Sequence, residues 1–234
     1  MAVDRILALG GGISPLVHTI LNFHGVGPVT RSVDAGERNC WLDQDAFEAV
    51  LDLVRGQPQV RLTFDDGNAS DFTHALPALK RRGLLATFFV CSGRLGQPTF
   101  VTPAEVRELQ AQGMTIGSHG VDHVPWRGLP AEKLRSELAE SRRVLGELCG
   151  RPVEAAACPF GSYDRRVLAG LRAAGYRAVY TSDGGRAAAN SWVRARTTIT
   201  RSMALNTIQD LVRRGIGPWR QAMISARKAI KQLR

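Results

Sequence analysis

The sequence predicts a single α/β domain built on a parallel sheet that is covered by helices. Three observations support this prediction: the chain has 234 residues, its hydrophobic content is 44% and its charged content 22%, and short apolar runs alternate along it with amphipathic segments. The length suffices for a full core without disulfides or a structural metal. The alternation does not separate an open sheet from a barrel. In both architectures the working site lies at the carboxyl ends of the strands.

Seven runs rich in β-branched or aromatic residues are the expected strands. They cover residues 18–23, 60–64, 86–90, 114–117, 153–158, 177–180 and 193–199. Three helices between them have recognisable ends: one begins after Asp43, one begins in a capping box at Thr102 and ends at Gly113, and the longest covers about residues 130–149. The longest helix places four leucines on an inward stripe: Leu134, Leu138, Leu145 and Leu148.

The composition limits the cellular environment and the binding partners that we expect for the protein. The formal net charge is +10, but seven Lys or Arg and no Asp or Glu lie between Leu211 and Arg234, so much of the excess is local. Charge without interleaved aromatic residues does not predict a nucleic-acid partner. No window reaches the ~18 apolar residues of a membrane span. Four well-separated cysteines and an N-terminus without a convincing leader predict a cytoplasmic protein.

The first chemical motif, Thr-Phe-Asp-Asp-Gly at residues 63–67, follows an expected strand. Adjacent carboxylates raise each other's pKa unless a cation or hydrogen-bond donors compensate. A bound metal would resolve that conflict, with one carboxylate as its ligand and the other facing the water that it deprotonates. The alternative is a solvated turn, because Asp-Asp-Gly is common turn composition.

The second motif, Gly-Ser-His-Gly-Val-Asp-His at residues 117–123, also follows an expected strand. His119 and His123 can converge on one ion if the segment makes a single turn, and the flanking glycines allow it. Together with one Asp they give three ligands and leave positions open for water and substrate, as in catalytic metal sites. The alternative is two loop histidines that act as caps.

The third motif, Cys-Pro-Phe-Gly at residues 158–161, ends another expected strand. A turn of this kind can aim a backbone N–H at a reacting oxyanion. A plain strand-to-helix turn explains the residues equally well. The motif therefore gains weight only from the other two.

Together the three segments resemble the polysaccharide deacetylase family, the NodB-like carbohydrate esterases of family 4. TFDDG at 63–67, ATFFV at 86–90, SHGVDH at 118–123 and PFG at 159–161 stand in the family's order, and the likeness spans roughly residues 18–201. The resemblance implies a distorted (β/α)7 barrel rather than an open sheet. It also implies a metal-dependent hydrolase that removes an N-acyl group, expected to be N-acetyl, from an amino sugar in a polysaccharide, glycolipid or nucleotide-sugar precursor.

The resemblance also assigns roles. Asp65 is the expected general base, and Asp66, His119 and His123 are the expected ligands of one divalent ion. Zn²⁺ is the expected metal, with Co²⁺, Ni²⁺ or Mn²⁺ as alternatives. The backbone N–H of Phe160 is the expected oxyanion donor.

Two departures from the family pattern affect catalysis. Many members have Arg and Pro where this chain has Ala157 and Cys158, and Arg196, on the last expected strand, is our hypothesis for the missing Arg. The family usually has a late histidine as general acid, but no His follows His123. His24, at the end of the first strand, is the best candidate; the alternative is a histidine bonded to a loop.

Two further residues are candidate substrate contacts. Trp126 offers a flat face for a sugar ring, unless it only packs in the core. Asp183 follows a strand and could bind a sugar hydroxyl, unless it only shapes a turn.

We divide the chain into an N-terminal extension (1–17), a NodB-like domain (18–203) and a basic C-terminal helical segment (204–234). Residues 211–234 fit a helix on an anionic membrane surface at the inner leaflet, or a covering helix with a solvated basic face. The rival functions are a carbohydrate-binding pseudoenzyme, because the late histidine is missing, and a deformylase of a lipid-linked amino sugar.

Overall fold

A computed structural model of the chain describes residues 17–33, 35–215 and 217–233, so the expected N-terminal extension lies almost wholly outside the described residues. The strands are β1 (Val17–Phe23), β2 (Val60–Phe64), β3 (Ala86–Val90), β4 (Thr115–Ser118), β5 (Ala155–Ala157), β6 (Ala178–Thr181), β7 (Arg186–Ala188), β8 (Val193–Ala195) and β9 (Thr197–Thr198). They form one sheet in the order β7-β1-β2-β3-β4-β5-β6-β8, with β9 paired to β1.

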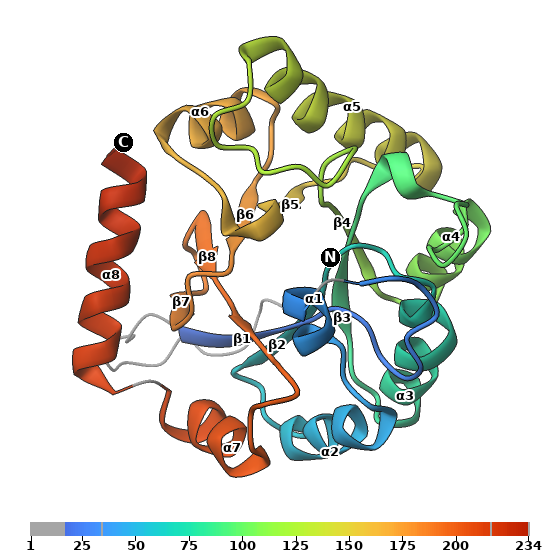
Figure 1. The fold of residues 1–234 in the computed structure, drawn as a ribbon, viewed down its shortest axis with the longest axis vertical. Coiled ribbons are helices and arrows are strands. Elements are labelled where there is room, and N and C mark those ends of the chain that lie inside the picture. The colour runs from blue at the N-terminus through green and yellow to red at the C-terminus, as the bar shows by residue number, and fades with distance from the viewer. Residues whose placement is uncertain (1–16, 34, 216, 234) are drawn as a thin grey trace, which may run out of the picture.

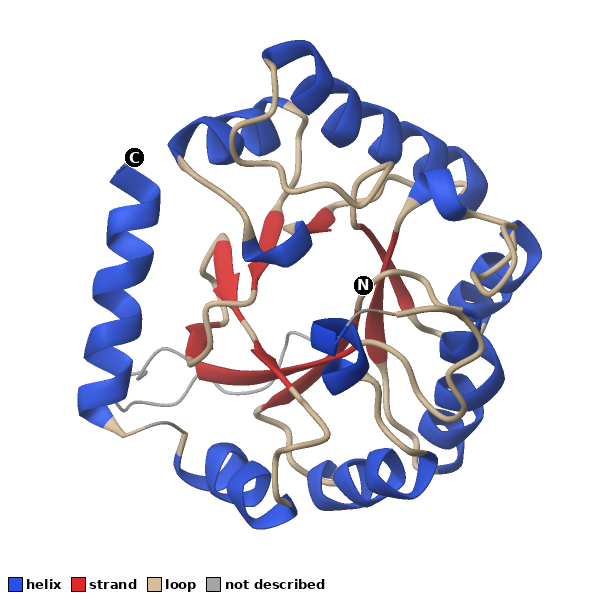
Figure 2. Ribbon diagram, in the orientation of Figure 1, coloured by secondary structure: helices blue, strands red, loops and turns tan. Residues whose placement is uncertain are grey.

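The helices are α1 (Ala35–Cys40), α2 (Gln44–Val54), α3 (Leu76–Arg81), α4 (Pro103–Ala111), α5 (Ala131–Cys149), α6 (Arg165–Ala173), α7 (Leu205–Arg214) and α8 (Pro218–Leu233), and a π-helical turn, Asp71–Ala75, leads into α3. Most of them surround the strands as an outer ring (Figure 1), and Figure 2 shows the strands enclosed by helices. None of the described helices has the length and apolar content needed to cross a bilayer.

The sheet curls into a nearly closed, distorted barrel in one domain. The pairings from β1 through β6 to β8 are parallel, and the short β7 runs antiparallel to β1. The seam lies between β6 and β1. There β8 pairs with β6, and β9, which follows it after one residue, pairs with β1. Arg196 is the residue between β8 and β9.

Aromatic packing fixes the strand ends that carry the chemical motifs. Phe23, Phe64 and Phe88, from β1, β2 and β3, stack in a row with ring centroids 5.2 and 4.6 Å apart. Phe47 of α2 meets Phe23 and Phe64 edge-on. Because strand side chains alternate, burial of Phe64 under α2 turns Asp65 towards the barrel mouth.

The expected strands agree with the observed ones to within about two residues at most ends, but two details differ. The last expected strand is broken at Arg196 into β8 and β9, and β7 was not expected. The capping box at Thr102 is confirmed, because its side chain accepts from the Glu105 N–H and the Glu105 carboxylate accepts from the Thr102 N–H. Asp43 occupies the N-cap position of α2 but makes no capping hydrogen bond; it pairs with Arg201 instead.

Candidate metal centre

The three motifs meet at the carboxyl ends of the parallel strands. Asp65 and Asp66 follow β2, His119 follows β4 and Phe160 follows β5. Parallel strands place such residues at one mouth of the barrel. The first and last of these motifs are more than 50 residues apart in the sequence, and the fold therefore brings them into one site.

Asp66, His119 and His123 form a cluster with the geometry of a metal site. One ligand atom from each lies within 4.8 Å of the other two. Asp66 Oδ1 is 2.9 Å from His123 Nε2 and 3.6 Å from His119 Nε2. When Nε2 is unprotonated on both rings, as metal binding requires, this buried oxygen has no hydrogen-bond donor. One carboxylate oxygen and two imidazole nitrogens facing a common point fit a divalent ion such as Zn²⁺.

The environment of His119 prepares it to bind a metal. Its Nδ1 donates to the carbonyl oxygen of Ala157 at 2.9 Å, so the neutral ring keeps the lone pair on Nε2, which faces Asp66. Burial lowers the pKa of His119 to about 4, although the nearby Asp65 and Asp66 carboxylates oppose the shift. The ring is therefore neutral near pH 7, as a metal ligand must be.

Asp65 lies beside the cluster in a separate network. Arg196 donates two parallel hydrogen bonds to its carboxylate, at 2.7 and 2.8 Å, and Asn22 donates a third at 3.0 Å. Arg196 also donates to Asn22 Oδ1 at 2.7 Å. Burial raises the pKa of Asp65, but the charge of Arg196 and the neighbouring groups outweigh burial and lower it to about 2. Asp65 is thus held ionised and in a fixed orientation.

Backbone strain is concentrated at this site. Four described residues other than glycine have positive φ, and three of them are site residues: Asp66 at 77°, His123 at 55° and Phe160 at 56°. Such conformations cost about 1–3 kcal/mol each and persist where the surroundings impose them. The Phe160 ring lies 4.6 Å from the His123 ring and is 65% exposed, so it forms an open apolar wall beside the cluster.

Comparison with known proteins identifies the chain's family. The sequence profile of the family described as polysaccharide deacetylase matches residues 53–179, more than half of the chain. The chain belongs to the polysaccharide deacetylase family. This confirms the resemblance found in the motifs.

The relatives fit this assignment. A putative polysaccharide deacetylase of Bacillus subtilis, YxkH, is 29% identical over 157 residues, covering 63% of this chain and 56% of the relative. A chitooligosaccharide deacetylase of Sinorhizobium fredii is 30% identical over 140 residues, covering 59% and 63%. The chain spans about half the length of the curated relatives that it matches.

Solved structures confirm the barrel fold. The Streptococcus pyogenes deacetylase PplD, in complex with acetate, superposes with a TM-score of 0.73 at 23% identity, covering 83% of this chain and 97% of that one. A polysaccharide deacetylase from Bacillus cereus gives a TM-score of 0.74 at 17% identity, covering 84% and 69%.

The histidine expected to act as a general acid lies beside the two aspartates of this deacetylase-family site. His24 follows β1, is half-buried, and its charge lowers the pKa of both Asp65 and Asp66. Its Nδ1 is buried and has no hydrogen-bond partner among the described residues. The alternative of a histidine bonded to a loop therefore finds no support at Nδ1, and the role of His24 as general acid stays a prediction.

The structure contradicts the expected substrate contact of Trp126 and shows Asp183 bound to other protein groups. Trp126 is 0% exposed and packs in the core, so its ring offers no face to a sugar. Both carboxylate oxygens of Asp183 are occupied: Tyr163 and Thr181 donate to Oδ2 at 2.6 and 2.8 Å, and Lys231 of α8 pairs with Oδ1 at 2.6 Å. Asp183 therefore ties α8 to the barrel.

Sequence analysis missed Glu137 of α5. This fully buried carboxylate accepts from the backbone N–H of Val121 at 2.8 Å and of Asp122 at 3.2 Å, and so holds the loop between the two histidines. The helix places Glu137 and Ser141 among its buried residues beside Leu134 and Leu138. The sequence signal that could have identified Glu137 is a charged residue on the inward apolar stripe of a helix.

Asp71 is a second buried carboxylate near the site. Neither of its oxygens has a hydrogen-bond partner among the described residues. Burial raises the pKa of Asp71 well above its usual value, and the neighbouring charges of Asp66 and Asp65 add to the rise.

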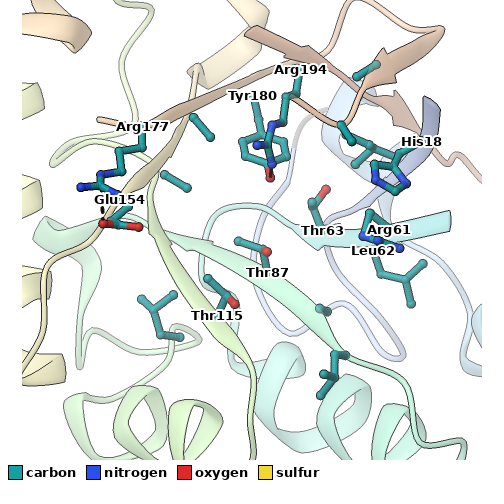
Figure 3. Close-up of a pocket in the computed structure, with 18 of the residues that line it drawn as sticks. His18, Arg61, Leu62, Thr63, Thr87, Thr115, Glu154, Arg177, Tyr180 and Arg194 are labelled. Atoms are coloured by element: carbon teal, nitrogen blue, oxygen red, sulfur yellow. Dashed lines mark hydrogen bonds and ion pairs between the residues drawn. The ribbon is translucent and has the colours of Figure 1, made fainter. Parts of the chain in front are cut away.

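A large hollow lies at the other end of the barrel. Its volume is about 790 Å³, and it is lined by the amino-terminal parts of the strands, with His18, Arg61 and Arg194 on one side and an Arg177–Glu154 ion pair on another (Figure 3). The cluster of potential metal ligands lies at the opposite mouth.

Proposed function

We propose that this protein is a metal-dependent hydrolase that removes an N-acetyl group from an amino sugar. The observation that carries the proposal is the convergence of Asp66 Oδ1 and the Nε2 atoms of His119 and His123, beside an Asp65 carboxylate held by Arg196. We propose Zn²⁺ as the metal, because a mixed carboxylate and imidazole set suits it, with Co²⁺, Ni²⁺ or Mn²⁺ as substitutes.

Each residue around the cluster has a separate role in the proposed amide hydrolysis. A bound divalent ion would polarise the acyl carbonyl and acidify its water. Asp65, ionised at neutral pH, accepts the proton from the attacking water. The backbone N–H of Phe160 donates a hydrogen bond to the oxyanion. His24 gives a proton to the departing amine, so that the products are a carboxylate and an amino sugar.

Two observations support a proposed substrate class: the names of two relatives and an apolar surface at the site. The related chitooligosaccharide deacetylase and a chitin deacetylase, 28% identical over 118 residues, are named for N-acetylated sugar polymers. The exposed Phe160 ring beside His123 supplies an apolar surface on which a sugar ring can stack. We therefore propose an N-acetylglucosamine-type substrate. Cytoplasmic localisation stays a prediction, and fractionation of the native host's cells tests it.

The first test is metal content and acetate release from N-acetylglucosamine oligomers. We expect about one divalent ion per wild-type chain, little in His123→Ala, and wild-type content in the control His74→Ala, whose histidine lies in the π-helical turn. Acetate release by wild type and by the control, but not by His123→Ala, supports the proposal.

Two outcomes contradict the hydrolase. Equal metal in all three proteins, or none in wild type after supplementation, removes the metal site. Specific metal with sugar binding but no acyl release indicates the carbohydrate-binding pseudoenzyme, whose motivation is the lack of any His after His123. Release of formate from a formylated amino sugar, with no release of acetate, indicates the deformylase.

A further inference from the structure

Helix α8 packs against the barrel through its lysines. Lys228 donates to the Val193 carbonyl oxygen at 3.0 Å, and Lys231 pairs with Asp183 at 2.6 Å and donates to the Gly161 carbonyl oxygen at 3.3 Å. The Lys231 ammonium also lies 5.0 Å from the centre of the Tyr163 ring. Burial lowers the pKa of Lys228, which places its side chain inside the interface. The inward face of α8 is therefore cationic.

The outward face of the same helix is apolar. Trp219, Met223 and Ile230 are 77%, 43% and 50% exposed, and Ala226 between them is exposed as well. At 3.6 residues per turn, positions 219, 223, 226 and 230 fall on one stripe. A helix that covers a barrel normally buries its apolar stripe and exposes its charges. On α8, Lys228 and Lys231 face the barrel together with the half-buried Ile224, whereas the stripe of Trp219, Met223, Ala226 and Ile230 is exposed.

The charge of the C-terminal segment indicates which kind of partner binds the apolar stripe of α8. Residues 211–234 contain seven Lys or Arg and no Asp or Glu. A second copy of the chain would bring the same cations against them, and like charges facing each other across an interface oppose association. Lys228 and Lys231 are held by the barrel, but Arg213 and Arg214 of the same segment are exposed. An anionic lipid surface accepts the apolar stripe between its headgroups and attracts such exposed cations.

We propose that α8 docks the protein on an anionic membrane surface, with Trp219, Met223 and Ile230 inserted at the level of the headgroups. The helix ends beside the candidate metal centre, since Lys231 holds the turn that carries the exposed Phe160 ring. Docking through α8 would hold the barrel, with its candidate metal centre, close to the lipid surface. Resting on the proposed function, this further implies a lipid-anchored amino sugar as the substrate.

The test is co-sedimentation of the full chain with vesicles. Wild type should bind vesicles of phosphatidylserine and phosphatidylcholine at low salt, and bind weakly to pure phosphatidylcholine, because the attraction is partly electrostatic. A triple variant with Trp219→Ser, Met223→Ser and Ile230→Ser should bind at least about tenfold more weakly. The matched control is Leu85→Ser, which removes a 66% exposed side chain before β3 and should bind as wild type does.

A second readout follows the helix itself. Trp41 and Trp126 are buried and Trp192 is half-buried, so Trp219 is the most exposed tryptophan. Its fluorescence should shift to shorter wavelength with anionic vesicles and be quenched by brominated lipid. Trp219→Phe should remove the quenching while keeping most of the binding.

Three results would overturn the proposal: no sedimentation of wild type with anionic vesicles, equal binding by the triple variant, or a dimer in light scattering that the triple variant loses. None of them depends on catalysis. Acetate release from a soluble oligosaccharide should be unchanged in the triple variant, so failure of docking and failure of the proposed hydrolase are separate results.

Discussion

At the scale of single residues, Arg196 makes the most specific contact of the site. It lies between β8 and β9, and its guanidinium meets Asp65 through two hydrogen bonds at 2.7 and 2.8 Å. Lysine offers a single charge without this planar fork. Arg196→Lys therefore tests orientation of the base apart from charge.

We expect Arg196→Lys to lower kcat by about 10²–10³-fold, the loss typical of a misplaced reacting group, and to keep its metal. Burial raises the pKa of Asp65 and Arg196 lowers it, so weaker pairing should move the acid limb of the kcat/KM profile to higher pH. Metal analysis and the pH profile check both points. Loss of metal, or an unmoved acid limb, would argue against a positioning role.

Asp71 allows a prediction about stability. Its folded-state pKa is raised by burial and by the charges of Asp66 and Asp65. The folded state therefore holds a proton that the unfolded chain releases near pH 4, so wild type loses stability as the pH rises above that value. Asp71→Asn removes this loss.

In metal-free protein, we expect Asp71→Asn to be more stable than wild type at pH 7, by about 1.4 kcal/mol for each unit by which the folded-state pKa of Asp71 exceeds its unfolded value. The two proteins should converge near pH 4. Thermal unfolding at a series of pH values measures the difference, and a constant gap across the series would contradict the assignment to Asp71.

The residues that carry chemistry differ in how far sequence could reveal them. His119 and His123 stand four residues apart and Asp65 and Asp66 are adjacent, so local spacing was enough to nominate them. Asn22 and Glu137 have meaning only through partners 43 and 16 residues away. A polar residue within an apolar pattern marks such positions but does not name the partner.

At the scale of elements, the loop after β4 depends on Gly120. Its φ is +83°, and a Cβ there would lie 2.6 Å from Glu137 Oε2 and 3.1 Å from Trp126 Nε1. Gly128 has a similar φ of +85° with nothing within 4 Å of its Cβ position. A comparison of Ala substitutions at these two glycines therefore separates the cost of backbone strain from the cost of crowding the loop that carries the metal ligands.

Gly128→Ala should cost about 1 kcal/mol of folding free energy, the usual backbone penalty. Gly120→Ala should cost more, about 2–4 kcal/mol in total, and should weaken metal binding about 10–100-fold, because it displaces the carboxylate that holds the loop. Denaturant unfolding and metal titration of both variants provide the measurements. Equal losses in both would show that the contact with Glu137 does not matter.

The elements that sequence predicted best are the buried parallel strands, because they read as continuous apolar runs. Strand β7 was missed because Arg186–Ala188 is short and carries no apolar pattern. The sequence did not determine which face of α8 packs on the barrel, and the reason is different. Spacing shows that the helix is amphipathic, but Lys228 and Lys231 find their partners on the barrel, at Val193, Gly161 and Asp183.

At the scale of the whole molecule, the core does not depend on the candidate metal centre. The buried aromatic row of Phe23, Phe64 and Phe88 lies under α2, and the metal cluster sits beyond it at the mouth of the barrel. The apo protein should therefore stay folded. Chelation should abolish acetate release while far-UV circular dichroism stays unchanged, and added metal should restore activity; unfolding on chelation would contradict this.

The choice of a barrel over an open sheet came from family resemblance, because periodicity describes strands and helices but not closure. Closure rests on one short segment, residues 193–198, which pairs with β6 and then with β1. Those pairings join strands whose sequence positions give no hint that they are neighbours.

That seam links the proposed activity to local opening of the barrel. The segment that closes the barrel also carries Arg196, so each transient break in its pairing with β6 or β1 would release Asp65, the proposed base, in the same event. Amide hydrogens at the seam, such as Arg196 N–H bonded to the Thr181 carbonyl oxygen and Ile199 N–H bonded to that of Asn22, report this opening. Their exchange rates should rise with temperature in step with the loss of turnover, well before the aromatic core exchanges.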